Sequence, residues 1–189
     1  SLGHIFFWIL FKVFFKLKSI GSSNVPNKGG VILAPNHVSF FDPPLVGTAI
    51  NHRRVYFIAR ATLFRFYVIG LILKAAHAVP IDLKGDWKIG LKKALDLLKN
   101  GKAVVVFPEG TRSLDGKLKK GKTGIGFLAY HSKVPVIPVL IKGSYDALPK
   151  GTKFIKSFKK ISVRYGKSID LAEFHKLADN ASTYRKISQ

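Results

Sequence analysis

A histidine and an aspartate lie five positions apart in this chain, at His37 and Asp42. An imidazole accepts a proton near neutral pH, and a neighbouring carboxylate fixes its tautomer and stabilises the imidazolium that forms. On a continuous helix the two side chains would point about 140° apart, so they pair only if the backbone bends between them. Pro43 makes Asp42 the expected N-cap of a helix, which supplies that bend. The pair is therefore a candidate general base.

A second polar turn lies at residues 107–113, which read Phe-Pro-Glu-Gly-Thr-Arg-Ser. Gly110 allows a ligand to approach the backbone closely, and Thr111 offers a hydroxyl donor. Arg112 carries a planar fork of donors that matches a phosphate. Glu109 either holds this arginine in place or caps the local backbone. The turn predicts an anion-binding site.

Each motif also has a plainer interpretation. Asp42 and Pro43 alone only begin a helix beside an unrelated surface histidine, and residues 107–113 alone form a turn with a solvated arginine. However, each motif follows a short apolar run of the kind that is buried in a parallel sheet. In such a sheet the strand ends form the ligand-binding crevice, so both motifs are expected at one crevice.

The elements that position these motifs alternate between strands and helices. Besides the run that begins at residue 31, the expected strands are residues 55–59, 78–82, 104–107, 136–141 and 161–165. The expected helices are residues 44–50, 87–99, 123–131 and 170–178. Residues 63–76 are apolar but too short to span a bilayer, which predicts a buried helix or the wall of a hydrophobic groove. The pattern predicts an α/β fold with a largely parallel or mixed sheet flanked by helices.

Residues 2–18 carry apolar and aromatic side chains around most of a helix, with Lys12 and Lys16 on one side. The uninterrupted apolar run is far shorter than the roughly 20 residues of a membrane-spanning helix. We therefore expect residues 1–18 to form an apolar helix that anchors the protein at the membrane interface, and residues 19–189 to form a single domain. The alternative is a helix in the core of a soluble domain or at an oligomer interface.

The chain holds 32 Lys and Arg against 10 Asp and Glu, a formal net charge of +22, which predicts an anionic partner. The sequence contains no Cys, which excludes an acyl-cysteine intermediate, and the scattered histidines predict no metal site. Nucleic acid is disfavoured because the aromatic residues cluster in apolar stretches and are not interleaved with arginine. An anionic membrane surface is the expected partner.

Residues 116–123 match the phosphate-loop pattern of nucleotide hydrolases, as Gly-Lys-Leu-Lys-Lys-Gly-Lys-Thr. A functional phosphate-binding loop directly follows a buried strand and surrounds the phosphates with small residues. This segment lies nine residues past Phe107, is rich in lysine, and is not followed by a strand ending in Asp that could hold magnesium. We interpret it as a basic loop beside the anion-binding turn.

Together the two motifs resemble those of the 1-acylglycerol-3-phosphate acyltransferases, the lysophosphatidate acyltransferases, which carry His, four residues and Asp, then a Phe-Pro-Glu-Gly-Thr-Arg block. The likeness spans roughly residues 20–145 and includes the Pro-containing strand at 134–139. Arg60 stands where relatives often have Lys. One departure is Leu83, followed by Lys84, at a position where relatives frequently carry a phosphate-binding Arg. Lys84 or Arg60 is the expected substitute.

This resemblance implies transfer of a fatty acyl group from acyl-CoA or acyl carrier protein to the sn-2 hydroxyl of lysophosphatidate, forming phosphatidic acid in phospholipid synthesis. His37 would deprotonate the hydroxyl and Asp42 would orient His37. The substrate-binding residues would be Arg60, Glu109, Gly110, Thr111 and Arg112. No cofactor is implied, and the enzyme is expected to be peripheral or monotopic on the cytoplasmic face of the cell membrane.

Two alternatives stay open. The acceptor of a related acyltransferase would be another hydroxylated molecule, such as glycerol 3-phosphate or a lysolipid. A non-catalytic basic peripheral membrane protein would explain the charge and the N-terminal helix, but it leaves the pairing of His37 with Asp42 unexplained.

Overall fold

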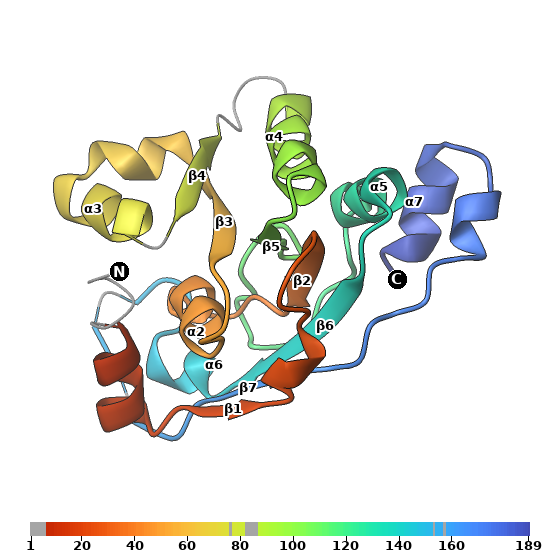
Figure 1. Ribbon diagram of the computed structural model, residues 1–189. Coiled ribbons are helices and arrows are strands. Elements are labelled where there is room, and N and C mark those ends of the chain that lie inside the picture. Colours follow the sequence, from red (N-terminus) through yellow and green to blue (C-terminus); the bar gives the residue numbers. More distant parts are fainter. Residues whose placement is uncertain (1–6, 76, 82–86, 153, 157) are drawn as a thin grey trace.

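The computed structural model describes residues 7–75, 77–81, 87–152, 154–156 and 158–189. Within them, one sheet of seven strands has the order β1-β7-β6-β2-β5-β3-β4 (Figure 1). The strands are β1 (Lys18–Ile20), β2 (Val31–Pro35), β3 (Val55–Arg60), β4 (Ala78–Ile81), β5 (Ala103–Val105), β6 (Val136–Lys142) and β7 (Ser162–Tyr165). The predicted α/β class with a mostly parallel sheet is confirmed.

Five strands run in one direction and two run in the other. Strands β6, β2, β5, β3 and β4 pair in parallel, whereas β7 is antiparallel to β6 and β1 is parallel to β7. The starts of β1 and β7 therefore lie at the end of the sheet where the five parallel strands finish. His37 follows β2 at this same end.

Alternate residues of β2 pack on opposite faces of the sheet. Val31 and Leu33 join a core with α2 (Asp42–Thr48), α6 (Ser144–Ala147) and the π-helical turn η1 (Leu10–Phe14). Ile32 joins a second core with α4 (Trp87–Lys99) and α5 (Thr123–Ser132). Because the strand is buried on both faces, its sequence is a continuous apolar run. This run is why the strand could be predicted from the sequence.

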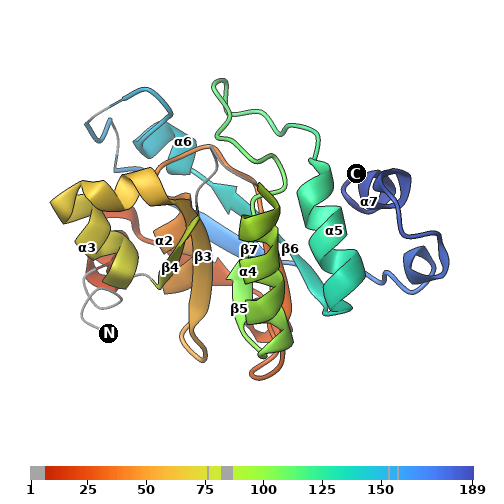
Figure 2. The same ribbon diagram turned by 90° about the horizontal axis from the view of Figure 1, so that it is seen from above.

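The predicted helices 87–99 and 123–131 are present as α4 and α5. The remaining helical elements are α3 (Tyr67–Ala75), α7 (Ala181–Ile187) and the 3-10 turns η2 (Ser22–Asn24), η3 (Ala61–Arg65) and η4 (Phe174–Lys176). Figure 2 shows the segment after β5 (green) and α6 (cyan) at the same end of the molecule. The two are joined by the Tyr145 hydroxyl, which donates to the carbonyl oxygen of Leu114 at 2.8 Å.

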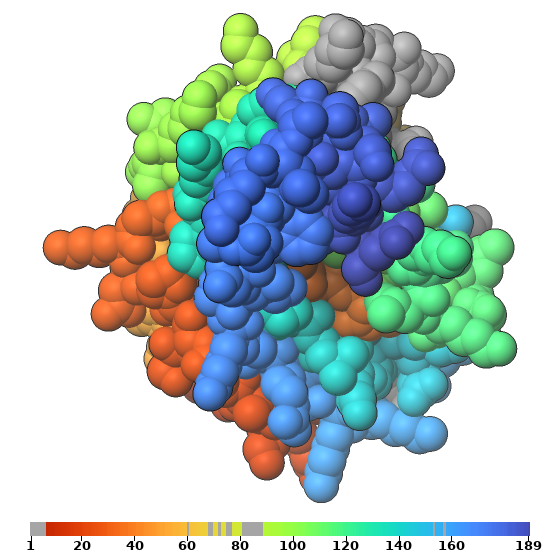
Figure 3. Space-filling view, turned by 90° about the vertical axis from the view of Figure 1, so that its right-hand side faces the viewer, coloured from red at the N-terminus to blue at the C-terminus, as the bar shows by residue number. Residues whose placement is uncertain are grey.

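The predicted helix at 170–178 is wrong. This segment holds only η4, because Asp170 accepts a hydrogen bond from the backbone N–H of Ala172 and begins a turn that competes with a helix. The last helix is α7, and its N-cap Asn180 accepts a hydrogen bond from the N–H of Thr183 at 3.0 Å. The C-terminal residues (blue) cover the surface beside α5 (teal) in Figure 3.

Of the two alternatives predicted for residues 63–76, the buried helix is wrong, and the wall of a hydrophobic groove stays a prediction. The segment forms η3 and α3, and Phe66, Tyr67 and Leu71 are exposed. The helix lies beside β4, the outermost strand on its side of the sheet (Figure 1), so less protein is available there to cover its apolar side chains.

The N-terminal helix ends earlier than predicted. Its helical residues reach Phe15, after which Lys16 takes a left-handed φ of 46° and Lys18 opens β1, a strand that the sequence did not predict. Phe11 and Phe15 are fully buried in the core, whereas Trp8, Val13 and Phe14 are exposed. One apolar side therefore belongs to the core, and a second apolar side faces outward.

Candidate active site

The side chains of His37 and Asp42 are in contact. Their Nδ1 and Oδ2 atoms lie 2.9 Å apart, Asp42 is fully buried, and 17% of the His37 side chain is exposed. The same Oδ2 accepts hydrogen bonds from the backbone N–H groups of Val38 at 2.6 Å and Ser39 at 2.7 Å. Because a carboxylate only accepts, Nδ1 carries the proton and Nε2 of the neutral ring is left as the base.

The bend between the two residues forms differently from the prediction. Asp42 is the first residue of α2 and makes no capping hydrogen bond to it, since Phe41 is the N-cap. Its carboxylate points back to the preceding turn, where three donors converge on one oxygen. The predicted pairing therefore exists, but the turn and not the helix holds the carboxylate.

Neighbouring elements fix the position of the histidine turn. Asn36 exchanges two hydrogen bonds with the backbone of Ile141 in β6, at 2.7 and 3.1 Å. The hydroxyl of Ser39 donates to the carbonyl oxygen of Leu148 at 2.8 Å, just after α6. Asn36 therefore attaches the start of the turn to the sheet, and Ser39 attaches the turn to the residue that follows α6.

Residues of the second motif contact His37 directly. Glu109 is buried, and its Oε1 accepts a hydrogen bond from the backbone N–H of His37 at 2.8 Å. The N–H of Ser113 donates to the carbonyl oxygen of His37 at 2.7 Å. The Phe107 ring stacks on the imidazole, with centroids 3.9 Å apart. The structure thus brings the two motifs to one site at the ends of β2 and β5.

Glu109 was predicted either to hold Arg112 in place or to cap the local backbone. In the structure it binds backbone N–H groups. Its other oxygen, Oε2, accepts from the N–H of Lys119 at 3.1 Å, so each carboxylate oxygen holds a backbone group. We assign Glu109 as a positioning residue that joins the histidine turn to the basic loop.

Arg112 lies at the surface of the same site. Its guanidinium carbon is 5.2 Å from the centroid of the Phe40 ring, which holds the cation by a cation–π contact. Partial burial lowers the pKa of Arg112, and the Asp42 carboxylate opposes that change; arginine stays protonated at neutral pH. Gly110 adopts a left-handed φ of 66° that favours glycine, and Thr111 is exposed. The turn presents a cation beside the base.

Lys122 is a further cation at this site that sequence reasoning did not single out. A Cβ atom at position 110 would lie 3.0 Å from Lys122 Cδ and 3.4 Å from its Nζ, so the lysine side chain crosses over Gly110. Its N–H donates to the carbonyl oxygen of Pro108 at 2.8 Å. The lysine-rich pattern of residues 116–123 signalled a basic loop beside the turn, but an irregular loop does not reveal which lysine lies over Gly110.

Arg60, and Lys84 as an alternative, were also predicted to contact the substrate phosphate. Arg60 is the last residue of β3, which ends at the same end of the sheet as β2, and its role stays a prediction. Leu83 and Lys84 lie outside the described residues.

A family model described as Acyltransferase matches residues 16–142, which is more than half of the chain and includes both motifs. The chain belongs to the acyltransferase family. This acyltransferase is 30% identical over 159 residues to the 1-acyl-sn-glycerol-3-phosphate acyltransferase of Bacillus subtilis, a match covering 84% of this chain and 76% of that protein. The resemblance predicted from the two motifs is confirmed.

Other relatives of this acyltransferase agree. The chloroplastic 1-acyl-sn-glycerol-3-phosphate acyltransferase BAT2 of Brassica napus is 31% identical over 173 residues, covering 89% of this chain and 49% of that protein. The crystal structure of the 1-acyl-sn-glycerophosphate acyltransferase PlsC from Thermotoga maritima matches with a TM-score of 0.80 at 29% identity, covering 98% of this chain and 73% of that one. The fold is therefore shared along nearly the whole chain.

Proposed function

We propose that this acyltransferase moves a fatty acyl group from an acyl thioester to the sn-2 hydroxyl of 1-acyl-sn-glycerol-3-phosphate, forming phosphatidic acid. The observation that carries the proposal is the 2.9 Å pair of His37 and Asp42, held by the same turn that presents Arg112. The names of the relatives in Bacillus subtilis and Brassica napus support this acceptor.

The reaction follows from the free Nε2 of His37. As the acceptor oxygen attacks the thioester carbonyl, Nε2 takes the hydroxyl proton, and the Asp42 carboxylate stabilises the imidazolium. When the tetrahedral intermediate collapses, the carbon–sulfur bond breaks and the imidazolium protonates the leaving thiolate. An ester bond forms and a free thiol leaves, so the step balances without a metal, a redox cofactor or an acyl-enzyme.

The acceptor phosphate is assigned to the cations beside this base. Arg112 offers a planar pair of donors, and Lys122 offers a point charge across Gly110. Arg60 is proposed as a third cation from β3. Glu109 links the base to the loop that carries Lys122, because its carboxylate accepts hydrogen bonds from the backbone of His37 and of Lys119.

The donor and the membrane are also proposals. Acyl-CoA and acyl carrier protein both present a thioester on an anionic carrier, which suits a chain of net charge +22. Among the described residues, no helix combines the length and the apolarity needed to cross a bilayer. We propose peripheral or monotopic binding at the cytoplasmic face of the cell membrane, with no nucleic-acid partner.

An acceptor comparison tests the function. The purified protein is given a labelled acyl thioester, as acyl-CoA or acyl carrier protein, with lysophosphatidate, glycerol 3-phosphate or a phosphate-free lysolipid. We expect labelled phosphatidic acid with lysophosphatidate, formed at least about a hundredfold more slowly by the His37→Ala variant. Faster transfer to glycerol 3-phosphate would identify that molecule, and not lysophosphatidate, as the acceptor. Vesicle binding without any transfer would indicate a non-catalytic membrane protein.

A further inference from the structure

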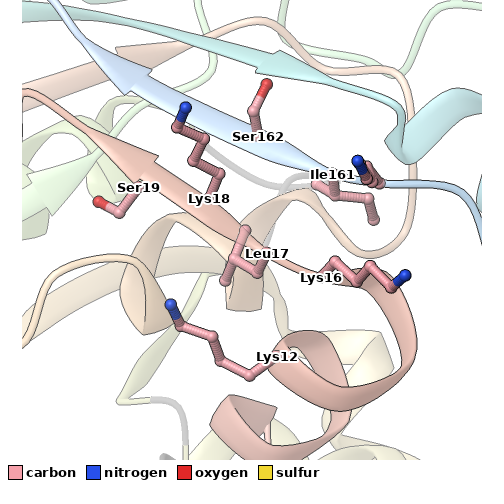
Figure 4. Close-up of a pocket in the computed structure, with 8 residues that line it drawn as sticks. Lys12, Lys16, Leu17, Lys18, Ser19, Ile161 and Ser162 are labelled. Atoms are coloured by element: carbon pink, nitrogen blue, oxygen red, sulfur yellow. The ribbon is translucent and has the colours of Figure 1, made fainter.

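A basic pocket of about 580 Å³ opens between η1, β1 and the start of β7. It is lined by Lys12, Lys16, Leu17, Lys18, Ser19, Lys160, Ile161 and Ser162. Figure 4 shows lysine side chains coming from the helix, from the turn after it and from β1. Two stretches that are distant in sequence, residues 12–19 and 160–162, thus bring four lysines to one cavity, and the lining includes no acidic residue.

Among the described residues, no carboxylate forms an ion pair with the four lysines of the pocket. The ion pairs found in the part of the chain that the structure describes join His37 to Asp42, His131 to Asp179 and Lys176 to Glu173. None of them involves the four lysines of the pocket. Like charges around one cavity repel each other, and an anion bound among them relieves that repulsion. The ligand chemistry that fits is a phosphate group.

Exposed apolar side chains lie in or next to the two stretches that line the pocket. Val13 and Phe14 of η1 are 63% and 52% exposed, and Phe158 is 58% exposed. The Phe14 and Phe158 rings lie 5.9 Å apart, so the two segments that supply the lysines also share one aromatic patch. Aromatic side chains at the acyl boundary with lysines at the headgroups are the pattern of a membrane-interface surface.

The strand register places this pocket level with the active site. Lys18 of β1 is paired with Ser162 of β7, which is paired with Lys142 of β6. Val139, three residues before Lys142, is paired with Pro35 at the end of β2. Lys18 therefore lies about as far along the sheet as the turn that carries His37, three strands or roughly 14 Å to the side.

We propose that this pocket binds the headgroup phosphate of an anionic phospholipid in the bilayer, while Val13, Phe14 and Phe158 enter the acyl boundary. The proposal rests on the proposed function in one respect, that the acceptor is a bilayer lipid. A protein held in this way has its active-site end against the membrane, because the pocket and His37 share one end of the sheet. The pocket is thus a second lipid site, separate from the site that holds the acceptor.

A charge-reversal comparison tests the pocket. The variant K12E/K16E/K160E is compared with K92E/K99E/K102E, which changes the net charge equally at exposed lysines in and just after α4. Binding is measured by sedimentation with phosphatidylcholine vesicles, with and without phosphatidylglycerol. Each lysine near an anionic surface contributes about a fivefold gain in affinity, so the pocket variant should bind at least about a hundredfold more weakly than the parent. The α4 variant should retain most of its affinity, and equal losses in both variants would overturn the proposal.

Two further measurements separate a lipid headgroup from free phosphate. In F14S/F158S, binding to the anionic vesicles should weaken, and the remaining binding should be more sensitive to salt, because the apolar contribution is lost. Inorganic phosphate at vesicle-equivalent concentration should leave vesicle binding of the parent protein unchanged. Displacement from the vesicles by inorganic phosphate would assign the pocket to a soluble anion and contradict the proposal.

An activity measurement distinguishes failure of the lipid-binding proposal from failure of the proposed function. Transfer to a short-chain lysophosphatidate in free solution should be the same in K12E/K16E/K160E as in the parent, which also shows that the variant is folded. Loss of soluble transfer in this variant alone would place the pocket in the catalytic machinery and reject a separate site. If the parent shows no transfer at all, the vesicle comparison still tests whether the pocket binds an anionic phospholipid.

Discussion

The buried carboxylate of Glu109 accepts a hydrogen bond from the backbone N–H of His37 at 2.8 Å. This contact connects residues 72 positions apart in sequence and makes the catalytic turn and the anion-binding turn one unit. With the bond from the Ser113 N–H to the carbonyl oxygen of His37, it clamps both backbone polar groups of the histidine. The spacing between the base and Arg112 is therefore set by the protein before the acceptor arrives.

Glu109→Gln should lower both stability and turnover. The amide NH2 group must face the N–H of either His37 or Lys119, and two donors cannot pair. We expect the free energy of unfolding to fall by about 1–3 kcal/mol, the cost of an unsatisfied buried group. Denaturant unfolding and steady-state kinetics measure the two effects. The control Glu173→Gln removes an exposed pair with Lys176 and should change stability by less than about 0.5 kcal/mol.

His37→Ala should lower kcat by about 10²–10⁴-fold, the usual contribution of a general base. The fold should be unchanged because the histidine is held through its backbone. Single-turnover transfer and thermal unfolding of the same preparation check this. Turnover near that of the parent would reject His37 as the base.

Asp42→Asn should retain the backbone hydrogen bonds from Val38 and Ser39 but lose the negative charge that stabilises the imidazolium. We expect kcat to fall by at least about 10²-fold, with KM for the acceptor little changed. Kinetics at saturating acceptor measure the loss. A variant whose main defect is in KM would assign Asp42 to acceptor binding instead.

Arg112→Ala and Lys122→Ala should each raise KM for lysophosphatidate by about 10–100-fold, as expected for a charged hydrogen bond of about 1.5–3 kcal/mol. Transfer to an acceptor without a phosphate should not change. The matched control is Lys120→Ala, an exposed lysine in the same loop. If Lys120→Ala raises KM as much as Lys122→Ala, the contact of Lys122 with Gly110 has no specific role.

Tyr165 should make the fold sensitive to alkaline pH. Its hydroxyl donates to the carbonyl oxygen of Val46 at 2.7 Å, and burial raises its pKa above the ordinary value near 10. Above that value the unfolded chain releases this proton while the folded chain retains it. Stability is therefore complete below about pH 10 and falls by up to about 1.4 kcal/mol per pH unit above it.

Denaturant unfolding of the parent protein, Tyr165→Phe and Tyr67→Phe at pH 8 and above pH 10 isolates this effect. Tyr165→Phe should be less stable at pH 8, because the Val46 carbonyl loses its donor, but should lose less stability on going to high pH. Tyr67 is exposed, so Tyr67→Phe should follow the parent. Parallel pH profiles for all three proteins would contradict the assignment.

Features that depend on neighbouring residues were predictable from the sequence. Helix α4 lies at 87–99 as predicted, because its apolar period is encoded along one segment. The pairing of His37 with Asp42 was predictable because one short turn contains both residues. The strand β2 was evident because burial on both faces requires an unbroken apolar run.

Features that depend on distant residues required the fold. The strand β1 has only three residues and no apolar pattern, and it exists because β7 offers it a partner. The hydrogen bond from Glu109 to His37, the reach of Lys122 over Gly110 and the gathering of Lys12 with Lys160 all join segments that are far apart in sequence.

By itself, the sequence determined the type of chemistry, since the base, its carboxylate and the anion-binding turn are local motifs at the ends of apolar runs. Only the tertiary structure decided how these motifs are joined, because a hydrogen bond depends on distances in space that neighbouring residues do not set. It also decided that a second, lysine-lined pocket faces the same end of the sheet, because that placement follows from the reversed direction of β1 and β7.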